Sequence, residues 1–423
     1  MRGYLLLLLS IVTISTCFAQ KECASQVYFQ HESYVNPALV KKIQEIETFI
    51  NNRLYNNEPR MSPAGATGNG FAVIKIPIIV HVIYNTEEQK ITVEQVRSQI
   101  EVLNKDFRKL NPGASNLPDY FKVLAADCFI EFRLATIDPY GKSTTGIIWK
   151  KTNTSSFGSD DRIKFSTSGG DDAWDASQYL NIWVGKLSAG MVGYSSSPGS
   201  VKEKDGIVLK YTAFGTTGTV IPPYNLGRTA VHEIGHWLGL KHIWGDRYCG
   251  DDLIADTPPQ KGATPGCPSG TLTSCDNSSS GSMYMNYMDV THDACTSMFT
   301  HGQRDRMRAL FEDGGPRHSF LLPHAPAGPL LPVAIELPTD TVNGKIISIF
   351  PNPAASMITI KEIGRNDLSG ERITIHNHLG QMVMQAYFTS KSINLYIGSL
   401  QSGLYFIRVG KDKVQKLIKR PVH

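Results

Sequence analysis

The chain has 423 residues, of which 41% are hydrophobic and 19% are charged, and its formal net charge at pH 7 is +4. This length allows two or three domains. The basic residues form no dense stripe with interleaved aromatic residues, so we expect no nucleic-acid partner.

The N-terminus carries the pattern of a secretory signal. The stretch "MRGYLLLLLSIVTISTCFAQ" has a basic start, a short apolar run and the small residue Ala19 before Gln20. A membrane anchor is the alternative, but the run is short for a helix that spans a bilayer. We predict a signal peptide at residues 1–19, export from the cell, and no transmembrane helix after signal removal.

Residues 20–60 are polar and look detachable from the rest of the chain. They contain the helical pattern "NPALVKKIQEIETFINNRL", and the breaker-rich stretch "NNEPRMSPAGATGNG" comes next. We predict that this segment is a prosegment.

Residues 61–318 have the pattern of an α+β domain. Strands are predicted at "FAVIKIPIIVHVIYN", "CFIEFRLATID", "YLNIWVGKL" and "DGIVLKY", and a helix at "TVEQVRSQIEVLNKDFRKL". A mixed twisted sheet with packed helices accounts for this order. The stretch "GMVGYSSSPG" is either an edge strand that pairs with an extended substrate or an ordinary surface hairpin.

A second helix is predicted at "NLGRTAVHEIGHWLGL", with Asn225 as its N-cap. Val231, Ile234 and Leu238 form one apolar stripe that can face the sheet. The histidines of this helix then lie on a neighbouring face.

The stretch "HEIGHWLGLKH" has the spacing of a metal site. His232 and His236 are four residues apart and emerge from one helix face, and Gly239 can end the helix so that His242 returns to the same ion. Three nitrogen ligands on Zn²⁺ leave a position for water, and Glu233 is placed to act as general base. Surface histidines on a packing helix are the alternative interpretation.

Six cysteines remain after signal removal, an even number in an oxidising setting: Cys23, Cys128, Cys249, Cys267, Cys275 and Cys295. The last four crowd one Gly- and Ser-rich region and suggest two disulfides there. Their spacing does not give the connectivity.

Two further segments come after the catalytic region. Residues 319–344 are a proline-rich linker, and residues 345–423 contain short alternating strands separated by turn residues, which predict a small C-terminal β-sandwich.

The zinc motif, with "GDRYCGDDLIADTPPQ" and "MNYMDVTHDACTSMFTHGQRDRM" after it, resembles the pappalysin branch of the metzincin metallopeptidases over roughly residues 71–311. The resemblance implies zinc at His232, His236 and His242, Glu233 as base, and Met288 as the Met-turn residue beneath the metal. It also implies the disulfides Cys249–Cys275 and Cys267–Cys295. Val290 stands where that family commonly has a tyrosine.

The loop after the zinc motif is rich in oxygen ligands suited to Ca²⁺, namely Asp246, Asp251, Asp252, Asp256 and Thr257. Solvated loop acids are the alternative. The family resemblance favours structural calcium.

Cys23 is a candidate for latency. Its thiolate could occupy the open position on zinc until cleavage near Arg60, or it could form a disulfide with Cys128.

The C-terminal module, with "FPNP" and "SGLYFIRV", resembles the sorting domain of type IX secretion in Bacteroidetes-like bacteria. The resemblance implies outer-membrane secretion machinery as a partner; a generic binding sandwich is the alternative.

Together these features predict a secreted or surface-attached zinc metalloendopeptidase, made as a zymogen, that acts on protein or peptide substrates. One alternative is a catalytically weak binding or adhesion protein on the same scaffold, motivated by Val290. The other is a zinc amidase that acts on cell-wall peptides.

Overall fold

The computed structural model describes residues 22–55, 71–278, 280–322, 346–363, 370–377, 381–388, 392–409 and 414–421. The predicted signal peptide, Arg60 and residues 323–344 of the predicted linker lie outside these residues. The chain divides into two compact units, Met1–Val333 and Ala334–His423, and this division falls within the predicted linker.

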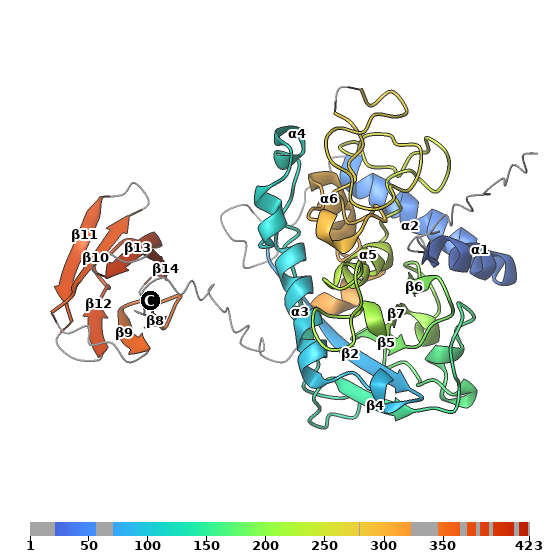
Figure 1. The fold of residues 1–423 in the computed structure, drawn as a ribbon, viewed down its shortest axis with the longest axis horizontal. Coiled ribbons are helices and arrows are strands. Elements are labelled where there is room, and N and C mark those ends of the chain that lie inside the picture. The colour runs from blue at the N-terminus through green and yellow to red at the C-terminus, as the bar shows by residue number, and fades with distance from the viewer. Residues whose placement is uncertain are drawn as a thin grey trace, which may run out of the picture. The chain divides into compact units, whose positions relative to one another are not determined.

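A mixed sheet forms the centre of the first unit (Figure 1). Its strands are β1 (Glu22–Cys23), β2 (Ile74–Tyr84), β3 (Ile130–Leu134), β4 (Ile147–Lys151), β5 (Leu180–Gly185), β6 (Met191–Ser195) and β7 (Gly206–Lys210). Their order is β1-β6-β7-β5-β2-β3, and β4 also pairs with β2. β6 is antiparallel to β7, whereas the other pairs are parallel. The predicted mixed sheet is confirmed.

Strand alternation gives this sheet two different faces. Ile182 of β5 and Leu209 of β7 belong to the main core, which also includes α3 (Val93–Phe107) and α5 (Arg228–Trp237). Trp183 and Val208 point the other way and pack with Tyr194 of β6 in a separate cluster. The metal-motif helix therefore lies on one face, and this aromatic cluster lies on the other.

The helix α5 starts differently from the prediction. Asn225 is not its N-cap; the cap is Gly227, which has a φ of 75° and no side-chain oxygen to offer. The carboxylate of Asp293 instead accepts hydrogen bonds from the backbone N–H groups of Leu226 and Arg228. A residue 65 positions beyond Arg228 thus replaces the local cap, which a sequence pattern cannot reveal. The apolar stripe of Val231, Ile234 and Leu238 is fully buried, as predicted.

The predicted prosegment forms two helices, α1 (Ser25–Val35) and α2 (Pro37–Tyr55). Only α2 was predicted. It places Ile46 and Ile50 in the main core. The buried residues of α1 are Ser25, Tyr28 and Glu32, so its inner face is mostly polar and shows no apolar periodicity.

Two shorter helices, α4 (Asp119–Lys122) and α6 (His301–Ala309), complete the α-helices of the described first unit. α6 begins with a capping box between Thr300 and Gln303. No helix in the described parts of the chain is both long and apolar enough to cross a membrane.

A buried ion pair ties the end of this unit to α5. Arg317 forms a bidentate pair with Asp205, and its guanidinium lies 3.9 Å from the ring centroid of Trp237. The indole N–H of Trp237 also donates to Asp205 at 2.7 Å. Arg317 and Asp205 are 2% and 6% exposed, so each charge depends on the other.

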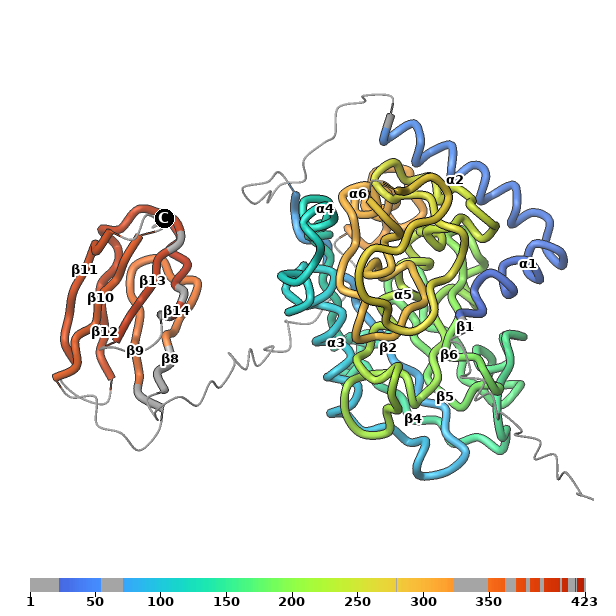
Figure 2. The backbone as a smooth tube through the Cα atoms, turned by 45° about the horizontal axis from the view of Figure 1, so that its top comes forward, coloured from blue at the N-terminus to red at the C-terminus, as the bar shows by residue number. Residues whose placement is uncertain are grey.

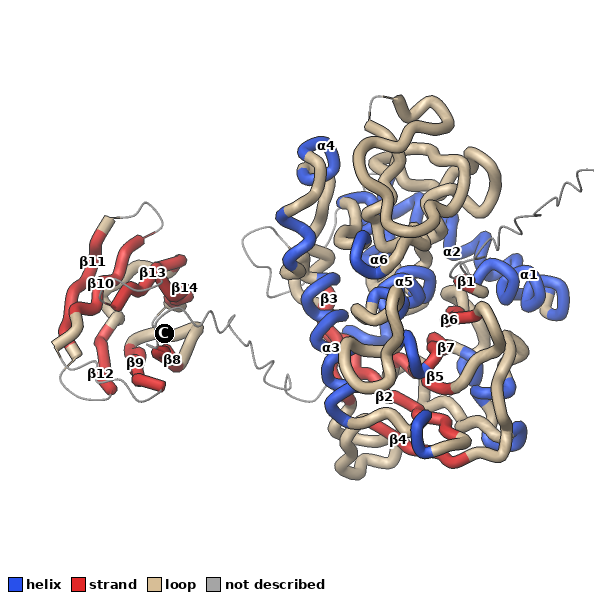
Figure 3. The backbone as a smooth tube through the Cα atoms, viewed as in Figure 1, coloured by secondary structure: helices blue, strands red, loops and turns tan. Residues whose placement is uncertain are grey.

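The second unit contains two antiparallel sheets (Figure 3). Their strands are β8 (Ile346–Phe350), β9 (Met357–Ile363), β10 (Arg372–Asn377), β11 (Met382–Tyr387), β12 (Ser392–Tyr396), β13 (Gly403–Val409) and β14 (Val414–Lys419). The sheet orders are β11-β10-β13-β14 and β12-β9-β8. Ile360 of β9 and Ile375 and Ile407 of the larger sheet share one core, as the predicted β-sandwich requires.

Replacing Arg317 with alanine leaves the Asp205 carboxylate buried without its cation. We expect the free energy of unfolding of the first unit to fall by about 3–5 kcal/mol. Urea unfolding followed by tryptophan fluorescence measures it, since all five tryptophans precede residue 245. Arg162→Ala is the control, because its pair with Asp160 is half exposed and its loss should cost less than about 1 kcal/mol. Equal effects of the two substitutions would contradict the role of the buried pair.

Candidate metal centre

Three histidines converge at the end of α5. His232 and His236 lie one helical turn apart, and Gly239, with a φ of 79°, ends the helix and turns the chain back. The Nε2 atom of His236 lies 3.1 Å from Nε2 of His232 and 3.2 Å from Nε2 of His242. The structure thus brings together the three side chains that the spacing predicts.

The protonation of these rings follows from their other nitrogen atoms. Nδ1 of His232 lies 2.7 Å from the carbonyl oxygen of Tyr287, and Nδ1 of His236 lies 2.9 Å from that of Leu240. Nδ1 of His242 lies 2.5 Å from a carboxylate oxygen of Asp246. An acceptor at Nδ1 favours the tautomer that carries its proton there, which leaves the Nε2 lone pair of each ring free to bind a metal ion.

This donor set fits a zinc ion. Lone pairs at 3.1–3.2 Å repel unless a cation lies between them. Tetrahedral zinc, with Zn–N distances of about 2.0–2.1 Å, separates its nitrogen ligands by roughly 3.3 Å. The sulfur of Cys23 completes the group, and the four candidate ligand atoms all lie within 4.8 Å of one another. Thiolate sulfur and imidazole nitrogen are both common zinc ligands.

Met288 lies against the metal-motif helix. It is fully buried, and a Cβ atom added at Gly235 would lie 2.4 Å from its sulfur. Glycine at position 235 therefore lets the methionine pack directly beneath α5. The role of Met288 as a Met-turn residue beneath the metal stays a prediction.

Glu233 lies beside the histidines and is fully buried. One of its carboxylate oxygens accepts a hydrogen bond of 2.7 Å from the hydroxyl of Ser25, and the sulfur of Cys23 lies 3.8 Å from the same oxygen. The Ser25 hydroxyl also accepts from the backbone N–H of Ser195 in β6. Sequence reasoning missed Ser25, because nothing local marks it as a partner of Glu233.

The edge strand β6 is covered by the N-terminal segment. β1 pairs with it in parallel and sets Cys23 opposite Gly193, and the chain then enters α1 directly (Figure 2). The two N-terminal helices also line a cavity of about 330 Å³ beside His236. The stretch forms β6, which is antiparallel to β7, and its outer side is occupied by the chain's own residues 22–23.

The alternative pairing of Cys23 with Cys128 is wrong. The Cys23 sulfur lies 3.5 Å from Nε2 of His236, whereas Cys128 is fully buried in the main core. Burial raises the pKa of the Cys128 thiol well above its usual value. A buried thiol in an apolar core behaves as a small hydrophobic side chain.

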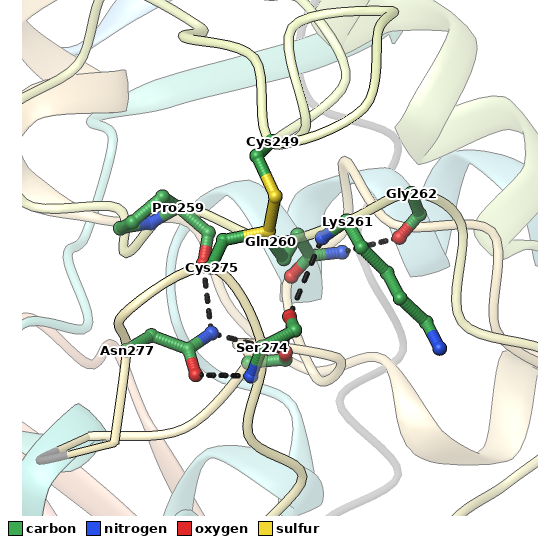
Figure 4. The surroundings of a disulfide bond; sticks show 9 residues. Cys249, Pro259, Gln260, Lys261, Gly262, Ser274, Cys275 and Asn277 are labelled. Carbon is green, nitrogen blue, oxygen red and sulfur yellow. Dashed lines mark hydrogen bonds between the residues drawn. A yellow bond between two sulfur atoms is a disulfide. The ribbon is translucent and has the colours of Figure 1, made fainter.

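The other four cysteines form the disulfides Cys249–Cys275 and Cys267–Cys295, the pairing that the family resemblance implies. Figure 4 shows the first of them beside Asn277, whose side chain donates to the carbonyl oxygen of Pro259 at 2.7 Å. These cross-links constrain a long loop that has little regular secondary structure.

The acidic residues of this loop have different roles. Asp246 bonds to His242, and Asp256 accepts from the Thr300 hydroxyl and the Gly302 N–H at the start of α6. Asp252 accepts from the Thr257 hydroxyl, and burial raises the pKa of its carboxyl group to about 7. Asp251 accepts from the backbone N–H of Leu253.

Calcium at these residues stays a prediction. A buried carboxylate such as Asp252 gains most from a bound cation, so removing calcium with a chelator should lower the melting temperature of the wild type. We expect no such change in Asp252→Asn. Differential scanning calorimetry with and without added Ca²⁺ tests this, and an unchanged wild-type melting temperature would contradict calcium binding.

Val290 is buried and has no hydroxyl group. Tyr284 and Tyr287, the two tyrosines nearest to it in the sequence, do not replace that hydroxyl. The hydroxyl of Tyr284 donates to the carbonyl oxygen of Gly270. The buried Tyr287 side chain interacts with Asp106 and Arg228. The departure seen in the sequence therefore persists in the structure.

Comparisons with known proteins agree with this site. The family model of peptidase M43, described as pregnancy-associated plasma protein-A, matches residues 166–312. The secretion system C-terminal sorting domain matches residues 348–422. Mature mirolysin of Tannerella forsythia, solved with a cleaved peptide, is 46% identical and has a TM-score of 0.60; the match covers 61% of this chain and 99% of that one.

Promirolysin of the same organism is 42% identical and has a TM-score of 0.64, with 71% of this chain and 97% of that one covered. An extracellular metalloprotease of Sordaria macrospora is 38% identical over 139 residues, which are 31% of this chain and 48% of that protein. The chain thus spans about half the length of this curated relative. The sorting domain and the extracellular relatives make the chain a secreted or cell-surface protein.

Asp246 orients His242, and we expect Asp246→Asn to weaken metal binding by about 10- to 100-fold, because the neutral amide is a poorer acceptor for the Nδ1 proton. Competition with a chromophoric chelator measures the affinity. Asp276→Asn is a matched control, since both aspartates have left-handed backbones, with φ of 59° and 62°. An affinity equal to that of the control would rule out the positioning role.

Proposed function

The chain belongs to the pappalysin family of metzincin metallopeptidases, and we propose that it is a secreted zinc endopeptidase made as a zymogen. The observation that carries this proposal is the convergence of three Nε2 lone pairs beside the buried carboxylate of Glu233. Its substrates are proteins or peptides. The outer-membrane secretion machinery recognises its C-terminal sorting domain. These partners follow from the family and the sorting-domain match.

His232, His236 and His242 would hold the zinc ion, and a zinc ion bound there would supply Lewis-acid chemistry for an attacking water and a peptide carbonyl. Glu233 accepts the proton of the attacking water and delivers it to the leaving amine. Its burial beside the histidines suits this exchange, because the low dielectric strengthens its interaction with the reacting groups. Met288 supports the site from below without acting as a ligand.

Substrate binding uses the outer edge of β6. The backbone groups of β6 that now pair with β1 can pair with an extended peptide after the N-terminal segment has left. The N–H of Ser195, which now donates to Ser25, becomes available in the same step. The substrate backbone would then lie next to the metal ligands.

Latency follows from the same contacts. The Cys23 sulfur lies among the three histidine nitrogens, where it would take the position that water needs on a bound zinc ion, and the Ser25 hydroxyl donates to the carboxylate of Glu233. One short segment thus blocks the metal, the base and the edge strand together. Cleavage within residues 56–70, which include Arg60, would separate this segment from the catalytic region.

A catalytically weak binding protein is the second candidate, and Val290 favours it, because a tyrosine hydroxyl is missing as an aid to the developing oxyanion. Hydrolysis of unfolded protein distinguishes this candidate from the peptidase. Cleavage of muropeptides without cleavage of unfolded protein would instead support the zinc amidase.

Replacing Glu233 with glutamine keeps the shape of the side chain and removes the base. We expect the rate of hydrolysis of unfolded protein by the matured enzyme to fall by at least about 10²-fold while zinc stays bound. The assay pairs peptide release with elemental analysis. Glu203→Gln, an exposed residue, is the control. Hydrolysis that persists unchanged in Glu233→Gln would exclude Glu233 as the base.

Replacing Cys23 with serine removes the thiolate from the metal. We expect the intact proenzyme to cleave a small fluorogenic peptide severalfold faster than wild-type proenzyme, because water can then reach zinc. The double variant Cys23→Ser/Glu233→Gln is the control for contaminating peptidases. A Cys23→Ser proenzyme as inactive as the wild type would contradict latency through the metal.

A further inference from the structure

The N-terminal segment contacts the sheet on both faces. Cys23 and Ser25 lie on the face that carries the metal ligands. Tyr28, one turn into α1, packs instead with Tyr194 and Trp183, in the cluster on the opposite face. The segment therefore passes around the free side of β6, and its contacts on the far face are separate from the metal.

Tyr28 is inserted into a pocket on that far face, which we call the anchor pocket and define by Asp161, Lys164, Trp183, Tyr194 and Lys204. The Tyr28 hydroxyl donates to Asp161 at 3.0 Å, and the centroid of its ring lies 4.9 Å from that of Tyr194. The ammonium group of Lys164 lies 4.8 Å from the centroid of the Tyr28 ring. Tyr28 is only 2% exposed, so this side chain is enclosed.

Glu32 lies four residues after Tyr28, on the same face of α1. Its carboxylate lies 2.9 Å from the ammonium group of Lys204, which is also 3.1 Å from Asp161. Two residues of one helix thus enter the same polar network. By contrast, Val27 and Tyr34 of α1 are 62% and 85% exposed, so Tyr28 and Glu32 supply much of what holds this helix.

The charges of the anchor pocket balance only when α1 is in place. Lys164 is fully buried and pairs with Asp161 at 2.9 Å, and Lys204 shares that aspartate with Glu32. Two lysines then face two carboxylates. Without the N-terminal segment, Lys164 and Lys204 keep Asp161 but lose the carboxylate of Glu32, and the Tyr194 ring loses its contact with Tyr28. Such a pocket favours a ligand that offers an aromatic ring and a carboxylate.

We propose that the anchor pocket is a second, metal-independent binding site for the prosegment, which stays bound there through Tyr28 and Glu32 after the chain is cut. This proposal rests on the zymogen function proposed above. The metal contact and the anchor pocket lie on one short segment, so together they act as a bivalent attachment. Loss of the Cys23 contact leaves the anchor pocket in place, together with the packing of Ile46 and Ile50 of α2 in the main core, and release of the prosegment requires all of these contacts to open.

The test uses the full chain with Cys23→Ser and Glu233→Gln, so that neither the thiolate nor self-cleavage affects the result. A sequence-specific protease site placed at residues 61–66 allows the chain to be cut, and size-exclusion chromatography with mass spectrometry then shows whether the fragment ending near residue 60 elutes with the catalytic part. We expect it to co-elute. Its dissociation constant follows from dilution of the cut complex.

Substitutions on both sides of the pocket locate the site. We expect Tyr28→Phe and Glu32→Gln each to weaken retention of the fragment by about tenfold or more, because the first removes a hydrogen bond to the Asp161 carboxylate and the second removes the ion pair with Lys204. Tyr34→Phe, on the exposed side of the same helix, is the matched control and should change nothing. Lys204→Met should weaken retention of the fragment about as much as Glu32→Gln does. The double variant Glu32→Gln/Lys204→Met should retain the fragment little worse than either single variant, because both substitutions remove the same ion pair.

Thermal unfolding of each uncut variant shows whether it is folded, and Lys204→Met supplies an independent test if a prosegment variant does not fold. A fragment that leaves the parent chain at once after cutting would overturn the proposal. Retention that is unaffected by Glu32→Gln and Lys204→Met would overturn it as well. Neither result depends on hydrolysis, so the peptidase function and the Cys23 contact are judged separately by their own assays.

Discussion

The shared direction of three imidazole lone pairs constrains the rest of this fold. Each ring is held by an acceptor at its Nδ1 atom, and these acceptors come from different segments: the carbonyl of Tyr287, the carbonyl of Leu240 and the carboxylate of Asp246. The helix α5, the turn around Met288 and the cross-linked loop must therefore all be positioned correctly for one ion to bind. The disulfides and the buried pair of Arg317 with Asp205 stabilise that arrangement at a distance from the histidines.

The strand β6 lies between the histidine cluster and the N-terminal segment, so its pairing decides whether a peptide backbone can bind beside the histidines. Its inner side pairs with β7 and its outer side with β1, so the backbone groups suited to a peptide are held by the chain itself. Alternation along β6 then directs successive residues to opposite faces, Gly193 towards Glu233 and Tyr194 towards the aromatic cluster. A segment that wraps around this strand can reach the metal on one face and a charged pocket on the other.

Several local patterns were reliable, and their failures have a common cause. The strands, the helix α3 and the apolar stripe of α5 follow from periodicity, because burial of one face repeats at a fixed interval. The N-cap at Asn225 was wrong because Asp293 supplies the acceptor instead. The helix α1 was missed because its buried face is polar, and Asp246 was grouped with calcium ligands although it bonds to His242.

The sequence by itself determined the cluster of three histidines that fits a metal ion, the neighbouring carboxylate, the mixed sheet and the C-terminal β-sandwich. These features depend on spacings of a few residues, which the geometry of helices and strands converts directly into position. Only the tertiary structure decided where Cys23 lies, which groups orient the histidines, and that Tyr28 and Glu32 enter a charged pocket. The contacts of Cys23, Tyr28 and Glu32 join residues more than a hundred positions apart. The groups that orient the histidines lie 4 to 55 positions away from them, but no periodic pattern marks them. The energies of all these contacts depend on burial and on partner charges that no local pattern contains.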